Sequence, residues 1–549
     1  MSLGARKTVR SSRVVSFRPP QGRFARLWEK ARRVEVLLRV GLALFAAVLL
    51  WAVTKAWEPP FVYRVGDVLS KDIALVIPAD NDGTSPLNEL VPAREPLTAE
   101  TIQLLRQDHL REASSASRAQ GLSRSLATFG MIGALYALCG YFVYYQERRL
   151  LKDLRRFSAL LLLIVVAAAL ACWAWTDPWR AEIAPVVVFG MTCGIAYKRE
   201  LALLFSTSLL IFLGLVTGYG LGEFVVLIGA TATSILLVGR IRSRSKLIKI
   251  GFFTGLATVL LSLITGVLEG QSLAGPLCAM AARNGLWAFA AGLLMPGLLP
   301  FVESIFGVLT DMSLLELGDA SHPLLQELVR RAPGTYNHSI NVASIAEAAA
   351  EAIGARRLLV RVGAYFHDVG KMLKPGYFVE NQGAEANRHD ALVPAMSTLI
   401  IIAHVKDGAD LARQHHVPEP IMDFIEQHHG TTLVEYFYRR ASQQCETNPN
   451  GGSVHEEAFR YPGPKPQTRE AAVLMLADSV ESASRTLVEP TPARIEGLVE
   501  DIAMKRLLDG QFDECGLTLK QLRIVRDSLI KSLTAVYHGR VKYPDQRTA

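Results

Sequence analysis

The distribution of apolar residues is the feature that most constrains how this chain can fold. Half of the 549 residues are hydrophobic, and the excess lies between about residues 35 and 308. The apolar runs in this region are close to the length that a helix needs to cross about 30 Å of hydrocarbon. They lie at about 35–56, 126–145, 157–176, 182–197, 201–218, 223–239, 250–269 and 280–305. The sequence therefore predicts eight membrane spans, or seven if one of the two shortest runs does not cross.

Lysine and arginine residues in the short loops predict the orientation of these spans, because such loops stay in the cytosol. With eight spans, all basic stretches fall on one side: residues 1–34, 148–156, 198–199 and 240–249. The opposite loops are poor in positive charge. The first 34 residues carry ten basic residues and one acidic residue, which accounts for the whole net charge of +8. Contact with anionic lipid explains this arm more simply than a nucleic-acid polymer does.

These patterns divide the chain into five parts. We expect a basic cytosolic arm (1–34), a first transmembrane helix (35–56), a short extracytoplasmic segment (57–125), a seven-helix transmembrane region (126–308) and a cytosolic domain (309–549). The first apolar run has spanning length and its basic region is long, so we interpret it as a retained anchor and not as a cleaved signal peptide. Within the extracytoplasmic segment, residues 98–118 have a helical pattern.

The cytosolic domain reads as helical throughout, because alternating runs typical of strands are nearly absent from it. A helix start is expected at Ser321-His322-Pro323, with the Ser321 hydroxyl as the cap. Further helices are predicted at about 336–353, 358–367, 392–405, 418–428, 469–487 and 492–508. The predicted fold class is therefore all-α, with a polytopic transmembrane helix bundle followed by an all-helical cytosolic domain.

Histidine and aspartate residues recur where these helices are predicted to end. The stretch His367-Asp368-Val369-Gly370-Lys371 closes one helix, His404 is expected to end the next, and His428-His429 ends another. His338 lies in an earlier helix. Asp478 is the exception, since it stands in the middle of an apolar helix, where an unpaired buried carboxylate would be costly.

This combination of side chains suits chemistry on a phosphodiester, an anion that resists attack. Two divalent ions held close together can clamp its oxygens and generate hydroxide at neutral pH. Adjacent His367 and Asp368 fit such a site, with Asp368 bridging both ions. A His-Asp pair alone is weak evidence, because His389-Asp390 repeats it in a polar stretch without a matching set. We interpret that pair, and His415-His416, as ordinary surface or core residues.

The same residues resemble the HD-domain metal phosphohydrolases, whose pattern is H…HD…H…HH…D. Longer stretches resemble the seven-transmembrane HD-domain proteins of bacteria, and the resemblance covers about 280–540 strongly and the membrane spans more loosely. These stretches are 314–317, 334–339, 364–371, 377–382, 401–405 and 427–431. The resemblance implies an inner (plasma) membrane protein with a cytosolic HD domain that hydrolyses cyclic di-AMP to linear pApA, using two manganese or iron ions.

The resemblance also implies roles for individual residues. One ion would be held by His338, His367, Asp368 and Asp478, and the other by Asp368, His404, His428 and His429. Asp368 and Lys371 would be catalytic, with Lys371 facing the phosphate. The chain departs from the family's pattern in two respects. The large outer domain that usually follows the first span is missing its middle, and Asn337 and Val369 stand where relatives often have other residues.

The sequence alone leaves other functions open. An HD-type hydrolase of cyclic di-GMP is disfavoured because no Gly-Tyr-Pro follows His428-His429. Hydrolysis of another nucleotide phosphoester on a single metal would leave His404 without a role, and a non-catalytic nucleotide-binding membrane receptor would not need Asp368. Transport is disfavoured because Glu223 and Arg283 lie near span ends, where their charges can reach water. The sequence leaves the oligomeric state open, a homo-oligomer included.

Overall fold

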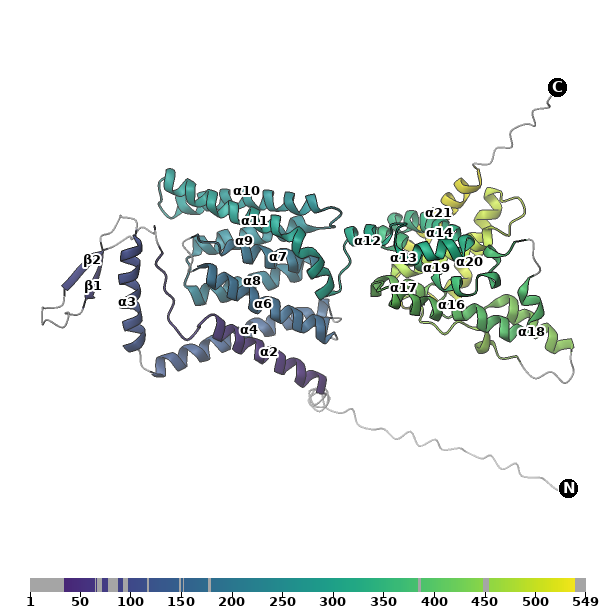
Figure 1. Cartoon of the computed structure of the whole chain (residues 1–549), viewed down its shortest axis with the longest axis horizontal. Coiled ribbons are helices and arrows are strands. Elements are labelled where there is room, and N and C mark those ends of the chain that lie inside the picture. Colours follow the sequence, from purple (N-terminus) through teal and green to yellow (C-terminus); the bar gives the residue numbers. More distant parts are fainter. Residues whose placement is uncertain are drawn as a thin grey trace, which may run out of the picture. The chain divides into compact units, whose positions relative to one another are not determined.

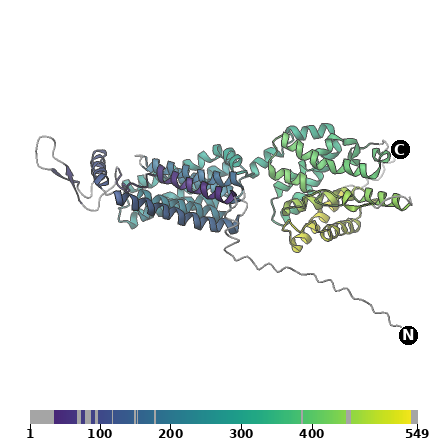
Figure 2. The same ribbon diagram turned by 90° about the horizontal axis from the view of Figure 1, so that it is seen from below.

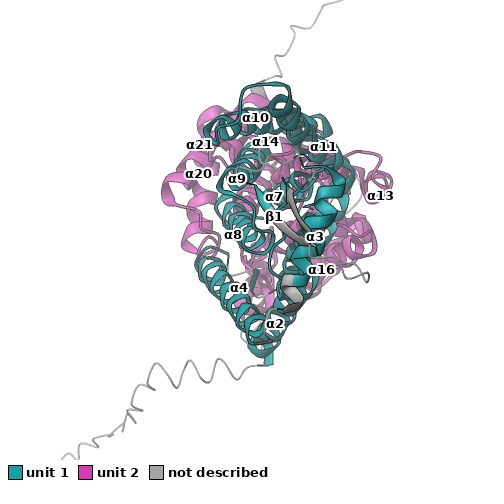
Figure 3. Ribbon diagram, turned by 90° about the vertical axis from the view of Figure 1, so that its left-hand side faces the viewer, with its two compact units in different colours: residues 1–239, 244–308 teal, residues 240–243, 309–549 magenta. Residues whose placement is uncertain are grey.

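The structure of the chain is a computed structural model, which describes residues 34–64, 66, 72–77, 87–91, 97–115, 118–147, 150–151, 153–175, 179–383, 387–447 and 454–538. The predicted basic arm therefore lies outside the described residues, except for Val34. The chain forms two compact units, shown in different colours in Figure 3. The first unit comprises residues 1–239 and 244–308, and the second comprises residues 240–243 and 309–549.

The first unit is a bundle of apolar helices that lie side by side (Figures 1 and 2). They are α2 (Val34–Val53), α4 (Arg118–Gln146), α6 (Leu154–Trp175), α7 (Ile183–Ala196), α8 (Arg199–Thr217), α9 (Leu221–Val238), α10 (Arg244–Leu268) and α11 (Gly275–Phe306). All except α7 are long and apolar enough to cross a membrane, which makes seven candidate spans among the described residues. Helix α7 has 14 residues and is about 21 Å long, so the shortest predicted run forms a helix below spanning length.

The segment between α2 and α4 contains the only strands among the described residues. Strand β1 (Ile73–Ile77) pairs antiparallel with β2 (Leu87–Val91), and helix α3 (Ala99–Ser115) follows. The predicted helix in this segment is confirmed, whereas the hairpin was not predicted. Near the start of the segment, the Arg64 guanidinium donates to the Glu182 carboxylate at 2.9 Å. This buried ion pair fixes the segment to the residues that precede α7.

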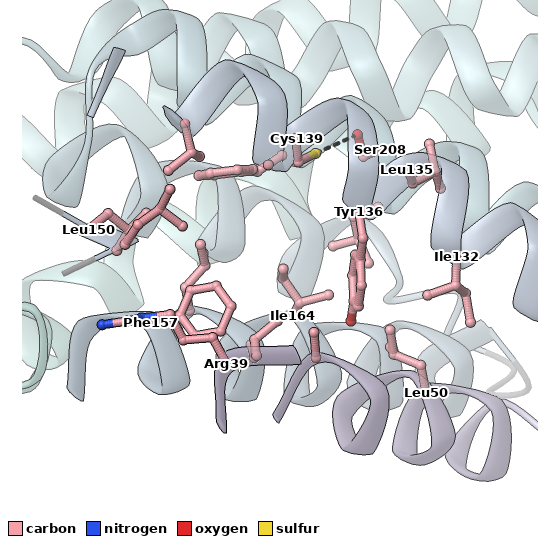
Figure 4. A pocket seen from close by; sticks show the side chains of 18 of the residues that line it. Arg39, Leu50, Ile132, Leu135, Tyr136, Cys139, Leu150, Phe157, Ile164 and Ser208 are labelled. Carbon is pink, nitrogen blue, oxygen red and sulfur yellow. Dashed lines mark hydrogen bonds between the residues drawn. The ribbon is translucent and has the colours of Figure 1, made fainter. Parts of the chain in front are cut away.

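Helices α2, α4, α6 and α8 surround an apolar cavity of about 250 Å³ (Figure 4). Leu50, Ile132 and Ile164 line it, and Arg39 lies at one end. Helices α2 and α4 bury only 17% and 11% of their most apolar windows inside the protein, against 39–56% for the other candidate spans. Lipid is therefore expected to cover most of these two helices, since apolar surface is stable in hydrocarbon.

The second unit is helical throughout its described residues, as predicted. Its helices are α12 (Asp311–Leu317), α13 (Pro323–Arg331), α14 (Pro333–Ala352), α15 (Arg357–Phe366), α16 (Pro394–Gln414), α17 (Glu419–Gln427), α18 (Glu435–Thr447), α19 (Arg469–Ser484), α20 (Pro492–Leu508) and α21 (Leu519–His538). Eleven of the sixteen residues of α19 are buried, because this alanine-rich helix is packed against α14, α15, α17, α20 and α21. The core of the domain therefore forms around α19.

Two details of the predicted helices are wrong. Helix α16 continues to Gln414, so His404 lies inside a helix and not at its end. The extra turns are stabilised by packing, because Ala409 and Ala412 are buried in the core. At the start of α13 the capping residue is His322, whose Nδ1 accepts a hydrogen bond from the Leu324 amide at 3.3 Å. The Ser321 hydroxyl does not cap the helix.

Helices α10 and α11 approach each other very closely at two glycines. A methyl group added at Gly292 would lie 2.3 Å from the Cα atom of Gly251, and one added at Gly251 would lie 2.7 Å from the Cα atom of Gly292. Membrane helices associate through close packing, since hydrocarbon removes the hydrophobic drive between them. The two glycines therefore set the distance between these helices.

We expect Gly292→Ala to destabilise the full chain by about 1–3 kcal/mol, as overpacking of a close contact does. Thermal unfolding in an uncharged detergent measures this. Gly297→Ala is the matched control, because Gly297 lies on the same helix and an added methyl group there meets nothing within 4 Å. Equal melting temperatures for the two variants would show that α10 and α11 are not in contact at Gly292.

Candidate metal centre

The centre begins where α15 ends. His367 is the residue that caps this helix, and its Nδ1 lies 2.7 Å from the Ala364 carbonyl oxygen. A carbonyl can only accept, so Nδ1 carries a proton, and in the neutral ring Nε2 keeps its lone pair. The bond also occupies one of the last carbonyls of the helix, which have no partner within the helix itself. The single hydrogen bond to the helix end thus both orients the His367 ring and selects its tautomer.

Two further histidines are held in the same way. His404 Nδ1 lies 2.6 Å from the Ile401 carbonyl oxygen, and His428 Nδ1 lies 2.9 Å from that of Ile425. In each case the acceptor belongs to the residue three positions earlier in the chain. All three rings consequently point a free Nε2 lone pair away from their own helix. Metal-binding histidines characteristically have their second nitrogen fixed like this.

His338 is held by a carboxylate instead of a carbonyl. Its Nδ1 lies 2.6 Å from Glu481 Oε2, and its Nε2 lies 3.0 Å from Asp478 Oδ1. Asp478 and Glu481 are three residues apart on α19, so they share one face of that helix. Arg485, one turn further along, donates to the other Glu481 oxygen at 2.6 Å and 2.9 Å. This chain of contacts locks the His338 ring between α14 and α19.

Asp368 lies at the middle of the centre, with its two oxygens facing different imidazoles. Oδ2 is 3.0 Å from His367 Nε2 and 3.4 Å from His338 Nε2. Oδ1 is 3.4 Å from His404 Nε2 and 3.6 Å from His428 Nε2. The carboxylate is therefore shared by two sets of nitrogen atoms. That is the arrangement a carboxylate needs if it is to bind two ions at once.

The described residues form two groups whose ligand atoms lie within 4.8 Å of one another. One group is His338, His367, Asp368 and Asp478, and the other is Asp368, His404, His428 and His429. Only His429 is partly exposed. Its ring packs on Tyr461 with 4.3 Å between the ring centroids. Each group offers four nitrogen and oxygen atoms, and the groups meet at Asp368.

Lys371 supplies a positive charge at the edge of the centre. Its Nζ lies 2.7 Å from Asp368 Oδ2 and 3.0 Å from Glu380 Oε1. Glu380 is held in turn by the Thr335 hydroxyl, which donates to the same oxygen at 3.1 Å. Lys371 follows Asp368 by one turn of 3₁₀ helix (η1, Val369–Leu373), so the chain places the cation beside the shared carboxylate.

Burial and neighbouring charges act in opposite directions on the acid–base equilibria of the centre. Burial lowers the pKa of His404 to about 3, and it lowers the pKa of His429 well below its usual value. Burial would raise the pKa of Asp368, but His367 and Lys371 outweigh it and hold that pKa well below the usual value. His404 and His429 are therefore neutral and Asp368 is ionised at neutral pH, which are the forms that bind metals.

The residues fit divalent metal ions. Nε2 of His367 and both carboxylate oxygens of Asp368 are buried and form no hydrogen bond of normal geometry within the described part of the chain. Buried polar atoms are nearly always hydrogen-bonded or bound to an ion or water. The donors are imidazole nitrogens and carboxylate oxygens, with no cysteine in either group. Such a set suits divalent transition metals without requiring a soft one.

A glycine allows the two halves of the centre to meet. A methyl group added at Gly370 would lie 1.9 Å from the His404 carbonyl oxygen. The backbone just after Asp368 therefore runs directly against α16, the helix that carries His404. This contact explains in physical terms the glycine of the His-Asp-x-Gly-Lys sequence.

The structure brings together all seven residues predicted as ligands, with Lys371 beside them. The other histidine pairs lie elsewhere. His389 Nε2 contacts the Tyr377 carbonyl oxygen at 2.9 Å, and Asp390 pairs with Arg440 at 3.4 Å. Neither they nor His415 and His416 belong to the two groups.

Sequence reasoning missed three residues of the centre: Glu380, Tyr461 and Glu481. The spacing of Glu481 from Asp478 was a signal for that residue, because side chains three residues apart on a helix are neighbours.

Comparison with known proteins agrees with this architecture. Residues 123–310 match the family "7TM receptor with intracellular HD hydrolase", and residues 335–483 match the HD domain family. Cyclic-di-AMP phosphodiesterase PgpH of Listeria monocytogenes is 45% identical over 342 residues, which cover 62% of this chain and 46% of that protein. The PgpH of Bacillus subtilis is 40% identical over 373 residues, covering 66% of this chain and 51% of that protein. This chain thus spans about half the length of the curated relatives it matches.

A solved structure was also found, the L. monocytogenes PgpH HD domain in complex with cyclic-di-AMP. It is 51% identical, with a TM-score of 0.38, and the match covers 40% of this chain and 100% of that one.

We expect Glu481→Ala to lower the affinity for divalent metal by about 10–100-fold, the usual effect of removing a residue that orients a ligand. The measurement is metal retained by the full chain after equilibration against buffered Mn²⁺. Glu496→Ala, at an exposed position on α20, is the control. Unchanged metal retention in a folded Glu481→Ala protein would show that His338 does not need this carboxylate.

Proposed function

We propose that this chain, a member of the family of seven-transmembrane receptors with an intracellular HD hydrolase, is a metal-dependent phosphodiesterase that hydrolyses cyclic di-AMP to pApA. The observation that carries the proposal is the pair of four-residue groups that share Asp368. The relatives named as cyclic-di-AMP phosphodiesterases, at 40–45% identity, support the choice of substrate.

The two groups would each hold one divalent ion. His338, His367, Asp368 and Asp478 would hold the first, and Asp368, His404, His428 and His429 the second. When bound, two such ions supply Lewis acidity to the phosphodiester and lower the pKa of water. We propose manganese or iron, because imidazole and carboxylate donors without thiolate suit these metals.

The protein's own contribution is to hold these donors rigid. The rings of His367, His404 and His428 each have Nδ1 fixed on a backbone carbonyl. Their Nε2 atoms therefore need no reorientation when ions bind. Preorganisation of this kind removes a reorganisation cost that a flexible site would meet during the reaction.

We assign Lys371 to the phosphate of the substrate. Its ammonium group is mostly buried, at 13% exposure, between Asp368 and Glu380. An ammonium with three donors can neutralise part of the phosphate charge as a point charge. Glu380 and Thr335 would keep Lys371 aimed at the centre, so they are positioning residues in this proposal.

We propose that the protein lies in the inner (plasma) membrane of a bacterium, with the HD domain in the cytosol. The basic loops support this orientation because, with α7 counted among the spans, they fall on the same side of the membrane as residues 309–549. The domains proposed from the sequence remain a cytosolic arm (1–34), a first span (35–56), an extracytoplasmic segment (57–125), a transmembrane region (126–308) and the HD phosphohydrolase domain (309–549). The bilayer and the cyclic dinucleotide are the proposed partners.

Asp368→Ala tests the shared carboxylate. We expect hydrolysis of cyclic di-AMP to fall by at least about 100-fold, since loss of even a supporting residue at a metal site costs 10–100-fold. Release of pApA by the purified chain with Mn²⁺, followed by chromatography, measures this. Asp390→Ala is the matched control, because it removes the aspartate of the second His-Asp pair, outside the centre. Retained turnover in Asp368→Ala would contradict the two-ion assignment.

A fragment of residues 309–549 tests whether the spans are needed for chemistry. We expect it to be soluble and to hydrolyse cyclic di-AMP in preference to cyclic di-GMP when both are offered with Mn²⁺, since every proposed ligand lies within it. A folded fragment that holds two metal equivalents but cleaves neither compound would shift the assignment to another phosphoester or to a nucleotide receptor.

A further inference from the structure

A second polar cavity lies in the unit that contains the HD domain, apart from the metal centre. Residues 240–243 join α9 to α10 in the chain, yet they belong to this unit. With α12, α14 and α15 they enclose a cavity of about 200 Å³. Its charged lining residues are Arg240, Arg242, Arg356, Arg357, Arg361, Asp311 and Glu347. Five guanidinium groups thus face two carboxylates.

The two carboxylates are already engaged by three of these arginines. Arg242 pairs with Asp311 at 3.4 Å, and Glu347 pairs with Arg361 at 3.2 Å and with Arg357 at 4.0 Å. Arg357 pairs with Glu351, outside the cavity, at 2.9 Å. These contacts fix the arginines but leave the lining with an excess of positive charge.

Arg356 carries part of this excess. Its guanidinium donates to the Leu309 carbonyl oxygen at 2.7 Å, and no carboxylate within the described residues forms an ion pair with it. Desolvation lowers the pKa of Arg356, and the charge of Arg240 adds to this effect, whereas Asp311 and Glu470 oppose it. The two arginines therefore repel each other across the cavity, and an anion between them would relieve the repulsion.

The first turn of α15 adds to the positive potential. Arg357 and Leu358, its first two residues, line the cavity. The side chain of the capping residue, Arg356, makes no capping hydrogen bond, and its amide donates to the Glu470 carboxylate at 3.0 Å. The amide groups of a helix N-terminus favour a negative charge nearby. The cavity therefore combines a converging set of guanidinium groups with a helix N-terminus.

We propose that this cavity binds the phosphate group of an anionic phospholipid. Guanidinium groups match the geometry of phosphate oxygens. Residues 240–243 directly follow one candidate span and directly precede the next, so chain connectivity keeps Arg240 and Arg242 close to a membrane surface. A volume of about 200 Å³ is smaller than the 300–1,000 Å³ typical of sites for drug-sized ligands. It suits a headgroup phosphate better than a dinucleotide.

The test uses the full chain purified in an uncharged detergent. Binding of a fluorescent short-chain phosphatidylglycerol is titrated, and unlabelled phosphatidylglycerol, phosphatidylcholine and inorganic phosphate are compared as competitors. We expect saturable binding that phosphatidylglycerol displaces and the other two do not. Arg356→Gln and Arg240→Gln should each weaken it by about tenfold, the effect of losing one charge-assisted contact. Arg523→Gln, an exposed arginine on α21 that does not line the cavity, should change nothing.

Two results would overturn the proposal. Equal affinity in the wild type and both variants, with unchanged elution and melting behaviour, would show that the cavity is not the lipid site. Displacement by inorganic phosphate at the same concentrations as phosphatidylglycerol would assign the cavity to a soluble phosphate compound and not to the membrane. Arg240 lies on an exposed loop, so its variant keeps the test valid if Arg356→Gln fails to fold.

Discussion

A carboxylate buried at 1% exposure cannot stay charged unless the surrounding protein compensates it, and the HD domain is organised around this requirement at Asp368. The loss of hydration is offset by Lys371 and by the imidazoles on either side. Helices α14, α15, α16 and α17 carry these imidazoles or end beside them, so the position of each helix decides where its ring lies. The packing of α14, α15 and α17 with α19, and of α16 with η1 and α17, is therefore also the condition for an ionised Asp368.

The supporting contacts of the centre are made largely by the backbone. His367, His404 and His428 are oriented by carbonyl groups three residues before them, and these carbonyls exist in any sequence. His338 depends instead on the side chain of Glu481, and His429 packs on the ring of Tyr461. Three of the five rings are consequently oriented by helix geometry, while the other two depend on side chains that a substitution can change.

The sequence was sufficient to predict the apolar helices, the helical HD domain and the residues that gather at the centre, because periodicity and the His-Asp pattern report on local geometry and chemistry. It was insufficient where packing decides. Helix α16 continues beyond His404 because Ala409 and Ala412 are buried in the hydrophobic core. The β1–β2 hairpin and helices α18 and α21 were missed, and Glu481 was overlooked because its partner comes from a helix 143 residues away.

The contact between Gly370 and the His404 carbonyl has a consequence for how this centre can diverge. An imidazole exchanged for another polar side chain alters the affinity for one ion and leaves the backbone in place. A single methyl group at residue 370 would instead push the Asp368 turn and α16 apart, and both groups of donors would lose their common member. A position without a side chain is thus one that natural variation cannot fill without separating the two groups, even though it takes part in no chemistry.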